Sequence, residues 1–266
     1  MTAVATPTGV GELLRQWRQR RRLSQLDLAV EAEVSPRHLS FVETGRSRPS
    51  RELVMHLAEH LDVPLRERNS LLLAAGYAPL YGQRSLEAEE MGPVRDALDR
   101  MLAGHEPFPA VVVDRHWNVV SANAPAMAIL SGISPELLEP PVNALRATLH
   151  PEGLAPMIVN LAEYSAHLLS RLHRQMVVSG DRELAALYDE LRRYPGVNDG
   201  SGTAPHPATL VFVPLVLRRP DGTELTFFST LASFGTALDV TLAELAIESF
   251  FPADPETEAT LRAGLG

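Results

Sequence analysis

Apolar residues in the first third of the chain recur every three or four positions. Residues at that spacing lie on one face of an α-helix, and the pattern therefore predicts amphipathic helices. We predict a first helix from Gly9 to about Arg21, a fourth after the cap residue Ser50, and a fifth from Leu65 to Ala75. Their inward positions are Leu13, Leu14, Trp17, Leu53, Leu57, Leu61, Leu71, Leu72 and Leu73.

Residues 23–50, which lie between these helices, predict two short helices joined by a tight turn. Ser24 can cap the first, Ser35 followed by Pro36 can start the second, and Gly45 can end it. Within the second helix, Leu39 and Val42 are three apart and face inward. The outward residues are Arg37, Ser40 and Phe41.

The string LSQxxLAxxxxVSxxxLSxxExG, followed by PS and LxxLAxxLxV, resembles the Xre-type helix-turn-helix of phage repressors over roughly Leu13 to Leu73. The resemblance implies that residues 35–43 form a recognition helix in the major groove of double-stranded DNA. It places DNA contacts at Gln25, Ser35, Pro36, Arg37, His38, Ser40, Phe41, Arg46 and Arg48. Similar helical units also serve as protein-interaction modules, and this alternative stays open.

The implied roles differ from residue to residue. Gln25 is expected to bind a phosphate, Arg37 and Phe41 to reach base edges, and the two later arginines to hold the DNA backbone. The resemblance also implies that Glu43 pairs with Arg18 inside the domain. Pro36 occupies a position where relatives often carry a base-reading amide, so fewer direct base contacts are expected.

Charge divides the chain in the same way. Residues 1–80 hold 11 Arg against 9 acidic residues, whereas the remaining 186 of the 266 residues hold 13 Arg against 24 acidic residues. The second part is therefore a poor candidate for DNA binding. The chain has no cysteine, no apolar run that approaches the roughly 20 residues of a membrane span, and no apolar signal core at its N-terminus. We expect a cytoplasmic protein.

From Pro93 the pattern changes to alternating strands and helices. Strands are predicted over 110–113, 117–120, 209–217, 224–230 and 244–251, and helices over 94–103, 144–149, 154–194 and 255–263, with a further helix capped by Asn123 and a hairpin turn at 219–222. This order indicates one antiparallel sheet with helices on one face.

The opening of this part resembles a PAS domain, and its order, with WNVVSANAPAM early and HPATLVFVPL late, resembles the ligand-binding half of the MmyB-like regulators over about Pro93 to Gly264. The predicted class is α+β. It comprises a five-helix, phage-repressor-like helix-turn-helix domain at 1–76, a linker at 77–92, and a PAS-like ligand-binding and dimerisation domain at 93–266. By this resemblance the effector is apolar or fatty-acid-like.

One predicted helix, 156–178, carries an apolar stripe beside a cationic one. An apolar surface with a cationic edge suits an acid with a hydrocarbon tail: the tail is buried, and Arg171 holds the carboxylate. The candidate ligand residues are Trp117, Met127, Met157, Leu168, Arg171, Leu172 and Phe212. Ordinary core packing is the alternative for each of them.

The sequence contains no HExxH, GxSxG or GxxxxGK string, so we expect no catalytic residue, metal or cofactor. The expected function is sequence-specific regulation of transcription by a homodimer, without a membrane partner, under the control of the effector. One alternative is a ligand-independent repressor whose second domain only dimerises. Another is an enzyme fused to a DNA reader.

Overall fold

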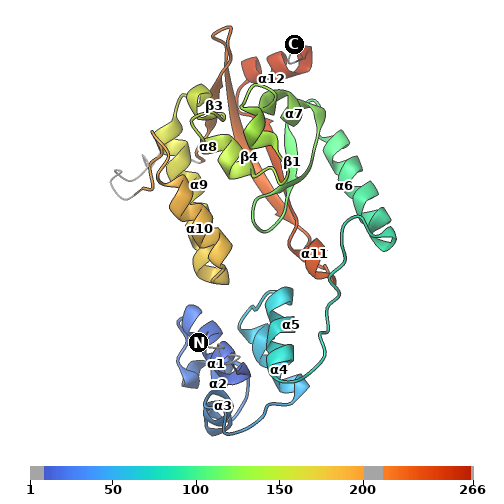
Figure 1. Ribbon diagram of the computed structural model, residues 1–266, viewed down its shortest axis with the longest axis vertical. Coiled ribbons are helices and arrows are strands. Elements are labelled where there is room, and N and C mark those ends of the chain that lie inside the picture. The colour runs from blue at the N-terminus through green and yellow to red at the C-terminus, as the bar shows by residue number, and fades with distance from the viewer. Residues whose placement is uncertain (1–8, 201–211, 265–266) are drawn as a thin grey trace, which may run out of the picture. The chain divides into compact units, whose positions relative to one another are not determined.

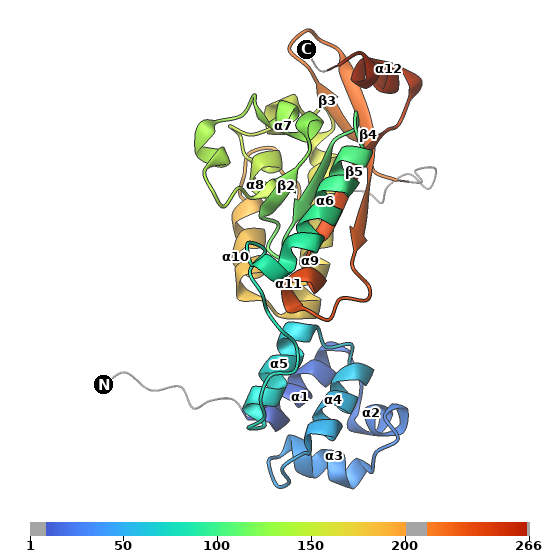
Figure 2. The ribbon, with the colours of Figure 1, turned by 90° about the vertical axis from the view of Figure 1, so that its right-hand side faces the viewer.

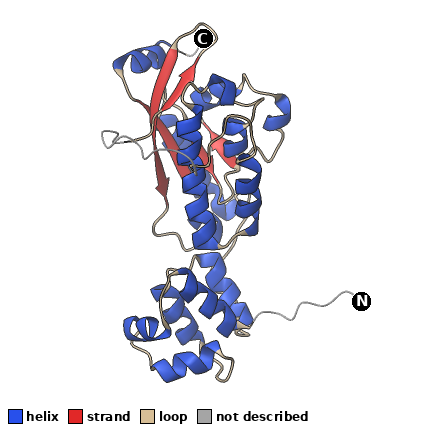
Figure 3. Cartoon of the chain, turned by 90° about the vertical axis from the view of Figure 1, so that its left-hand side faces the viewer, coloured by secondary structure: helices blue, strands red, loops and turns tan. Residues whose placement is uncertain are grey.

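The computed structural model describes residues 9–200 and 212–264, which fall into two compact units (Figure 1). Unit 1 is Met1–Arg84 together with Thr236–Ala243, and unit 2 is Ser85–Gly235 together with Glu244–Gly266. Within the described ranges, the strands belong to unit 2 and unit 1 is helical (Figure 3).

Unit 1 contains the five helices predicted for the first part of the chain. They are α1 (Val10–Arg20), α2 (Gln25–Glu31), α3 (Pro36–Glu43), α4 (Arg51–His60) and α5 (Leu65–Ala74). Leu14, Leu28, Leu39 and Leu57 pack in their shared core and are almost completely buried. Leu73 is the exception to the predicted inward positions, because α5 turns it away from the core and leaves it 59% exposed.

The predicted helix boundaries of the two short helices are also present. Ser24 and Asp27 form a reciprocal cap at the start of α2, with hydrogen bonds of 3.1 and 2.8 Å. Ser35 occupies the N-cap position of α3, but its hydroxyl makes no capping hydrogen bond, which corrects the expected cap. Gly45 follows α3 with φ of 72°, a left-handed conformation that glycine adopts without strain.

Unit 2 is built around a five-stranded antiparallel sheet in the order β2-β1-β5-β4-β3. The strands are β1 (Ala110–Val113), β2 (Val119–Ala122), β3 (Leu215–Arg218), β4 (Glu224–Ser233) and β5 (Ala246–Pro252). Its helices are α6 (Gly92–Gly104), α7 (Ala124–Leu130), α8 (Ala144–Leu149), α9 (Leu161–Ser179), α10 (Arg182–Leu191) and α12 (Pro255–Ala263). The α+β class is confirmed.

Several predicted boundaries in unit 2 are shifted. Trp117 lies in the turn with φ of 68°, and β2 begins two residues later. The long helical stretch divides at Gly180, which is left-handed and separates α9 from α10. The third predicted strand is shorter than expected, since β3 begins at Leu215; residues 209–211 lie outside the described residues.

Helices cover both faces of the sheet rather than one. All four residues of β1 are buried; Val111 and Val113 face the core beneath α7–α10, and Val112, which alternates with them, faces the opposite side. Helix α6 packs on β1, and Figures 1 and 2 show it across the sheet from α9 and α10. A strand buried on both faces reads as a continuous apolar run, which AVVV does.

The segment between β4 and β5 was not foreseen as part of the helical unit. It contains the short helix α11 (Val240–Ala243), which packs on α5. The Val240 amide donates to the Gly82 carbonyl at 2.8 Å, and Arg84 donates to the Asp239 carboxylate at 3.1 Å. The beginning of the predicted linker is thus hydrogen-bonded within unit 1.

Candidate DNA-binding face and effector cavity

The outer face of α3 is polar and accessible. Arg37 is exposed and its guanidinium lies 5.4 Å from the ring centroid of Phe41, which is half-buried. Arg37 makes no hydrogen bond or ion pair with another described residue. The remaining outward residues are the exposed Ser35, Pro36 and His38 and the half-buried Ser40. The residues of α3 that are predicted to contact DNA therefore lie on one face of the helix, and the positive charge on that face is Arg37.

The back of α3 is fixed by a buried ion pair. Arg18 of α1 donates to both carboxylate oxygens of Glu43, at 2.7 and 2.9 Å, as the resemblance implied. The side-chain amide of Gln25 donates to the same carboxylate at 2.8 Å. This contact engages the side chain that was expected to bind a phosphate. Glu43 thus joins the three helices on which the predicted DNA contacts depend.

The two arginines after α3, Arg46 and Arg48, are both exposed but differ in their contacts. Arg48 donates two hydrogen bonds to the Ala75 carbonyl, at 3.1 and 2.9 Å, and its guanidinium lies 5.3 Å from the Tyr77 ring centroid. Arg48 therefore helps to close the end of α5, a role that the sequence pattern did not indicate.

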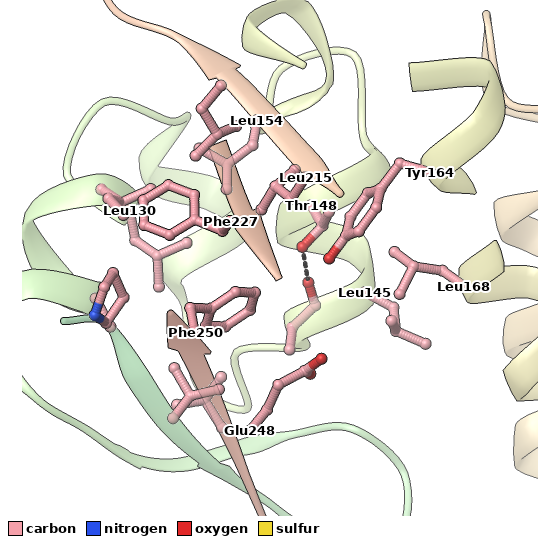
Figure 4. Close-up of a pocket in the computed structure, with 17 residues that line it drawn as sticks. Leu130, Leu145, Thr148, Leu154, Tyr164, Leu168, Leu215, Phe227, Glu248 and Phe250 are labelled. Carbon is pink, nitrogen blue, oxygen red and sulfur yellow. Dashed lines mark hydrogen bonds between the residues drawn. The ribbon is translucent and has the colours of Figure 1, made fainter. Parts of the chain in front are cut away.

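Unit 2 contains a cavity of about 80 Å³ beneath α7, α8 and α9 (Figure 4). Most of its wall is apolar, and representative lining residues are Val111, Ala126, Leu145, Leu168, Phe227 and Phe250. A single water needs about 10–15 Å³, so the space can hold several water-sized groups. It is smaller than the pockets of drug-sized ligands, which span roughly 300–1,000 Å³, so a bound effector would have to be small.

Three polar side chains interrupt the apolar wall: Thr148, Tyr164 and Glu248. Figure 4 shows the Tyr164 hydroxyl pointing toward Thr148, whose own hydroxyl donates to the Ala144 carbonyl at 2.8 Å. Tyr164 is only 5% exposed, and its hydroxyl has no hydrogen-bond partner among the residues the structure describes. Burial, together with the nearby charge of Glu248, raises the pKa of the Tyr164 phenol above its ordinary value. The hydroxyl therefore stays protonated and can donate.

Glu248 is a buried carboxylate, 5% exposed, that is held in place from behind the cavity wall. Arg171 donates to it at 3.2 Å, and the Ser229 hydroxyl donates to it at 3.0 Å. The Arg171 guanidinium lies 4.3 Å from the Trp117 ring centroid, and its buried Nε has no partner among the described residues. Glu248 rather than Arg171 is thus the charged group at the cavity surface.

The predicted ligand residues only partly coincide with this wall. Leu168 lines the cavity, whereas Trp117 and Leu172 are buried in the surrounding core and Met157 packs against it. Met127 and Phe212 are 50% and 47% exposed and lie outside the wall. The expected wall is corrected accordingly, because α7 turns Met127 to the surface and Phe212 precedes the sheet rather than lying within it.

Two residues that sequence reasoning missed define the polar part of the cavity. Tyr164 lies four positions before Leu168, so the same helical periodicity could have found it. Glu248 carried a different signal, since it is an acidic residue inside the apolar strand β5.

His56 and His60 are four residues apart on α4, a spacing that can serve a metal, but their rings contact each other edge to face with centroids 4.7 Å apart. Within residues 9–200 and 212–264, no group of three or more potential metal ligands occurs. In the same ranges, no helix is long and apolar enough to cross a membrane.

The accessible outer face of α3, anchored by the buried Arg18–Glu43 pair, and the largely apolar cavity of unit 2 suit a DNA-binding protein with a ligand-binding domain. Residues 10–71 match a family model described as a helix-turn-helix domain. Residues 94–263 match the model of the MmyB-like transcription regulator ligand binding domain. This second match covers more than half of the chain, which therefore belongs to the MmyB-like transcription regulators.

Other comparisons add little. No curated protein matches the chain significantly. Among solved structures, one described as "Structure of an RNA-binding Light-Oxygen-Voltage Receptor" is similar at 14% identity over 98% of this chain, with a TM-score of 0.27. The chain spans 62% of the length of that protein. So weak a likeness supports no argument about function.

Proposed function

We propose that this DNA-binding transcription regulator is sequence-specific, acts as a homodimer, and is controlled by a small effector with an apolar body in the cavity of unit 2. The observation that carries the proposal is the cavity itself, because a domain that only dimerised would need no apolar space inside its core. Of the expected apolar or fatty-acid-like effector, the proposal keeps the hydrocarbon part.

DNA reading is assigned to α3 and its flanks. Arg37 is free to reach guanine, and Phe41 can pack against a thymine methyl group. Ser35, His38, Ser40 and Arg46 lie where contacts to the backbone or to neighbouring bases are expected. A single recognition helix buries little DNA surface, which favours a dimer on two half-sites about 10 base pairs apart.

Control of DNA binding is assigned to the connection between β4 and β5. Glu248 and Phe250 of β5 line the cavity, and the segment just before β5, Thr236–Ala243, belongs to unit 1. An effector that shifts β5 would therefore act on the DNA-binding unit through this covalent connection. The effector changes DNA affinity only by as much as its own affinity differs between the two states of the protein.

A cavity-filling substitution tests the proposal. Ala126 lines the cavity on α7, whereas Ala128 is exposed on the same helix and provides a matched control. Purified protein is analysed by native mass spectrometry and by thermal shift with six-carbon compounds. Ala126→Leu should abolish the thermal shift and Ala128→Leu should keep it. No bound molecule and no shift in the wild-type protein would favour the ligand-independent alternative.

The enzyme alternative is less well supported. The acidic group of the cavity, Glu248, is already engaged by Arg171 and Ser229, and Tyr164 remains protonated. General acid–base catalysis needs a group that exchanges protons near the working pH, which the raised pKa of the Tyr164 phenol does not provide.

A further inference from the structure

We infer that the effector carries an uncharged head group that both accepts and donates a hydrogen bond, such as a hydroxyl, and that Tyr164 and Glu248 select it over an ionised carboxylate. This inference rests on the proposed effector function of the cavity and specifies the chemistry at its polar end. The sequence pattern had indicated a carboxylate held by Arg171.

The first step is the unused donor. Tyr164 is 5% exposed and lines the cavity, and its hydroxyl has no acceptor among the described residues. A donor that faces a mostly apolar cavity without a partner is unfavourable, so a ligand that supplies an acceptor oxygen satisfies it. The head group must therefore accept.

The second step is the pair of acceptors beside it. Thr148 uses its hydroxyl hydrogen on the Ala144 carbonyl and presents only lone pairs to the cavity. Glu248 presents a carboxylate whose Oε2 receives one hydrogen bond, from Arg171 at 3.2 Å, and can accept another. A head group that fills this corner must therefore also donate.

The third step is charge. An ionised carboxylate has no hydrogen to donate and would be placed near the negative charge of Glu248 in a poorly solvated cavity, where like charges repel strongly. Arg171 offsets this repulsion only in part, because it lies outside the cavity wall and its guanidinium is hydrogen-bonded to Glu248 rather than facing the ligand. An alcohol oxygen, by contrast, accepts from Tyr164 and donates to Thr148 or Glu248.

The small volume of about 80 Å³ sets the length of the probes. The experiment compares hexan-1-ol, its ether isomer 1-methoxypentane, which accepts but cannot donate, and hexanoate, by isothermal titration of the full-length wild-type protein. Tyr164→Phe removes the proposed donor. Tyr188→Phe is the matched control, because Tyr188 packs against the same core without lining the cavity.

Hexan-1-ol should bind about tenfold more tightly than either competitor, and Tyr164→Phe should weaken it about tenfold while Tyr188→Phe leaves it unchanged. If hexanoate binds as tightly as the alcohol, or more tightly, the head-group inference is overturned, but the proposed effector function of the cavity is not. The same holds if Tyr164→Phe has no effect on the alcohol. If none of the three compounds binds, both the inference and the proposed effector function fail.

Discussion

Arg18 and Glu43 meet through two hydrogen bonds of 2.7 and 2.9 Å, although they are 25 residues apart in the sequence. The pair fixes the end of α3 to α1, and both side chains are largely buried. A helix of eight residues is too short to be stable alone, so the orientation of α3 depends on such anchors. The Arg18–Glu43 pair, on the inner side of α3, therefore fixes the orientation in which the helix presents its outer face.

Removing one partner of this pair should destabilise unit 1. Glu43→Ala leaves the Arg18 guanidinium buried without its carboxylate, which costs about 3 kcal/mol in comparable cases. Chemical denaturation of the full chain measures the change in the free energy of unfolding. Glu12→Ala, an exposed substitution on α1, is the control and should have little effect. Equal stability of the two variants would show that the pair does not anchor α3.

The connection between β4 and β5 gives a second prediction. Asp239 accepts from Arg84 and from the Thr241 amide, at 3.1 and 2.9 Å. Asp239→Ala should release the segment from unit 1, so that amide hydrogen exchange becomes faster in residues 82–84 and 236–243. Glu256→Ala, at an exposed position of α12, should not change it. Unchanged exchange in Asp239→Ala would mean that this carboxylate does not hold the segment.

A third prediction concerns pH and the helices above the cavity. Arg146 of α8 binds Glu190 of α10 at 2.8 and 2.7 Å, and these hydrogen bonds hold the pKa of the Glu190 carboxyl below its ordinary value. A carboxyl with a lowered pKa in the folded state stabilises the protein above its unfolded pKa of about 4.3 and loses this contribution as the pH falls through the folded value.

Arg146→Met should therefore lower the melting temperature modestly at neutral pH, since a partly exposed pair contributes about 1 kcal/mol or less, and the difference from wild type should shrink below about pH 4. Thermal unfolding monitored by circular dichroism across this range provides the measurement. Arg192→Met breaks an exposed ion pair with Asp189 of α10 and serves as the control. A difference that stays constant into acid would argue against the assigned role of Glu190.

Local sequence signals accounted for most of the secondary structure. Ser24, Ser50 and Asn123 cap helices because their side chains accept from amides within three residues, a relationship visible in the sequence. Strand β1 and helices α8 and α12 have the predicted bounds for the same reason, since their apolar patterns and boundaries are local.

The cavity could not be predicted in the same way, because its wall combines elements far apart in the chain. Arg171 was singled out as the group that would hold a ligand carboxylate, but the carboxylate it binds belongs to Glu248, 77 positions later, and no local pattern selects this partner over a ligand. The packing of α11 on α5 likewise has no signal in the local sequence pattern. In both cases the contact joins segments that are distant in the chain, and it depends on how the whole fold packs.

The role of Arg37 is the most direct test of the account. Duplexes selected by the wild-type protein from a random pool give a preferred site, and fluorescence anisotropy compares that site with a scrambled duplex at several salt concentrations. Arg100→Ala, an exposed arginine of α6 in unit 2, is the control. Arg37→Ala should lose at least about tenfold of the preference for the selected site while keeping salt-sensitive binding to both duplexes. An undiminished preference in Arg37→Ala would contradict the assignment of α3 as the helix that reads DNA.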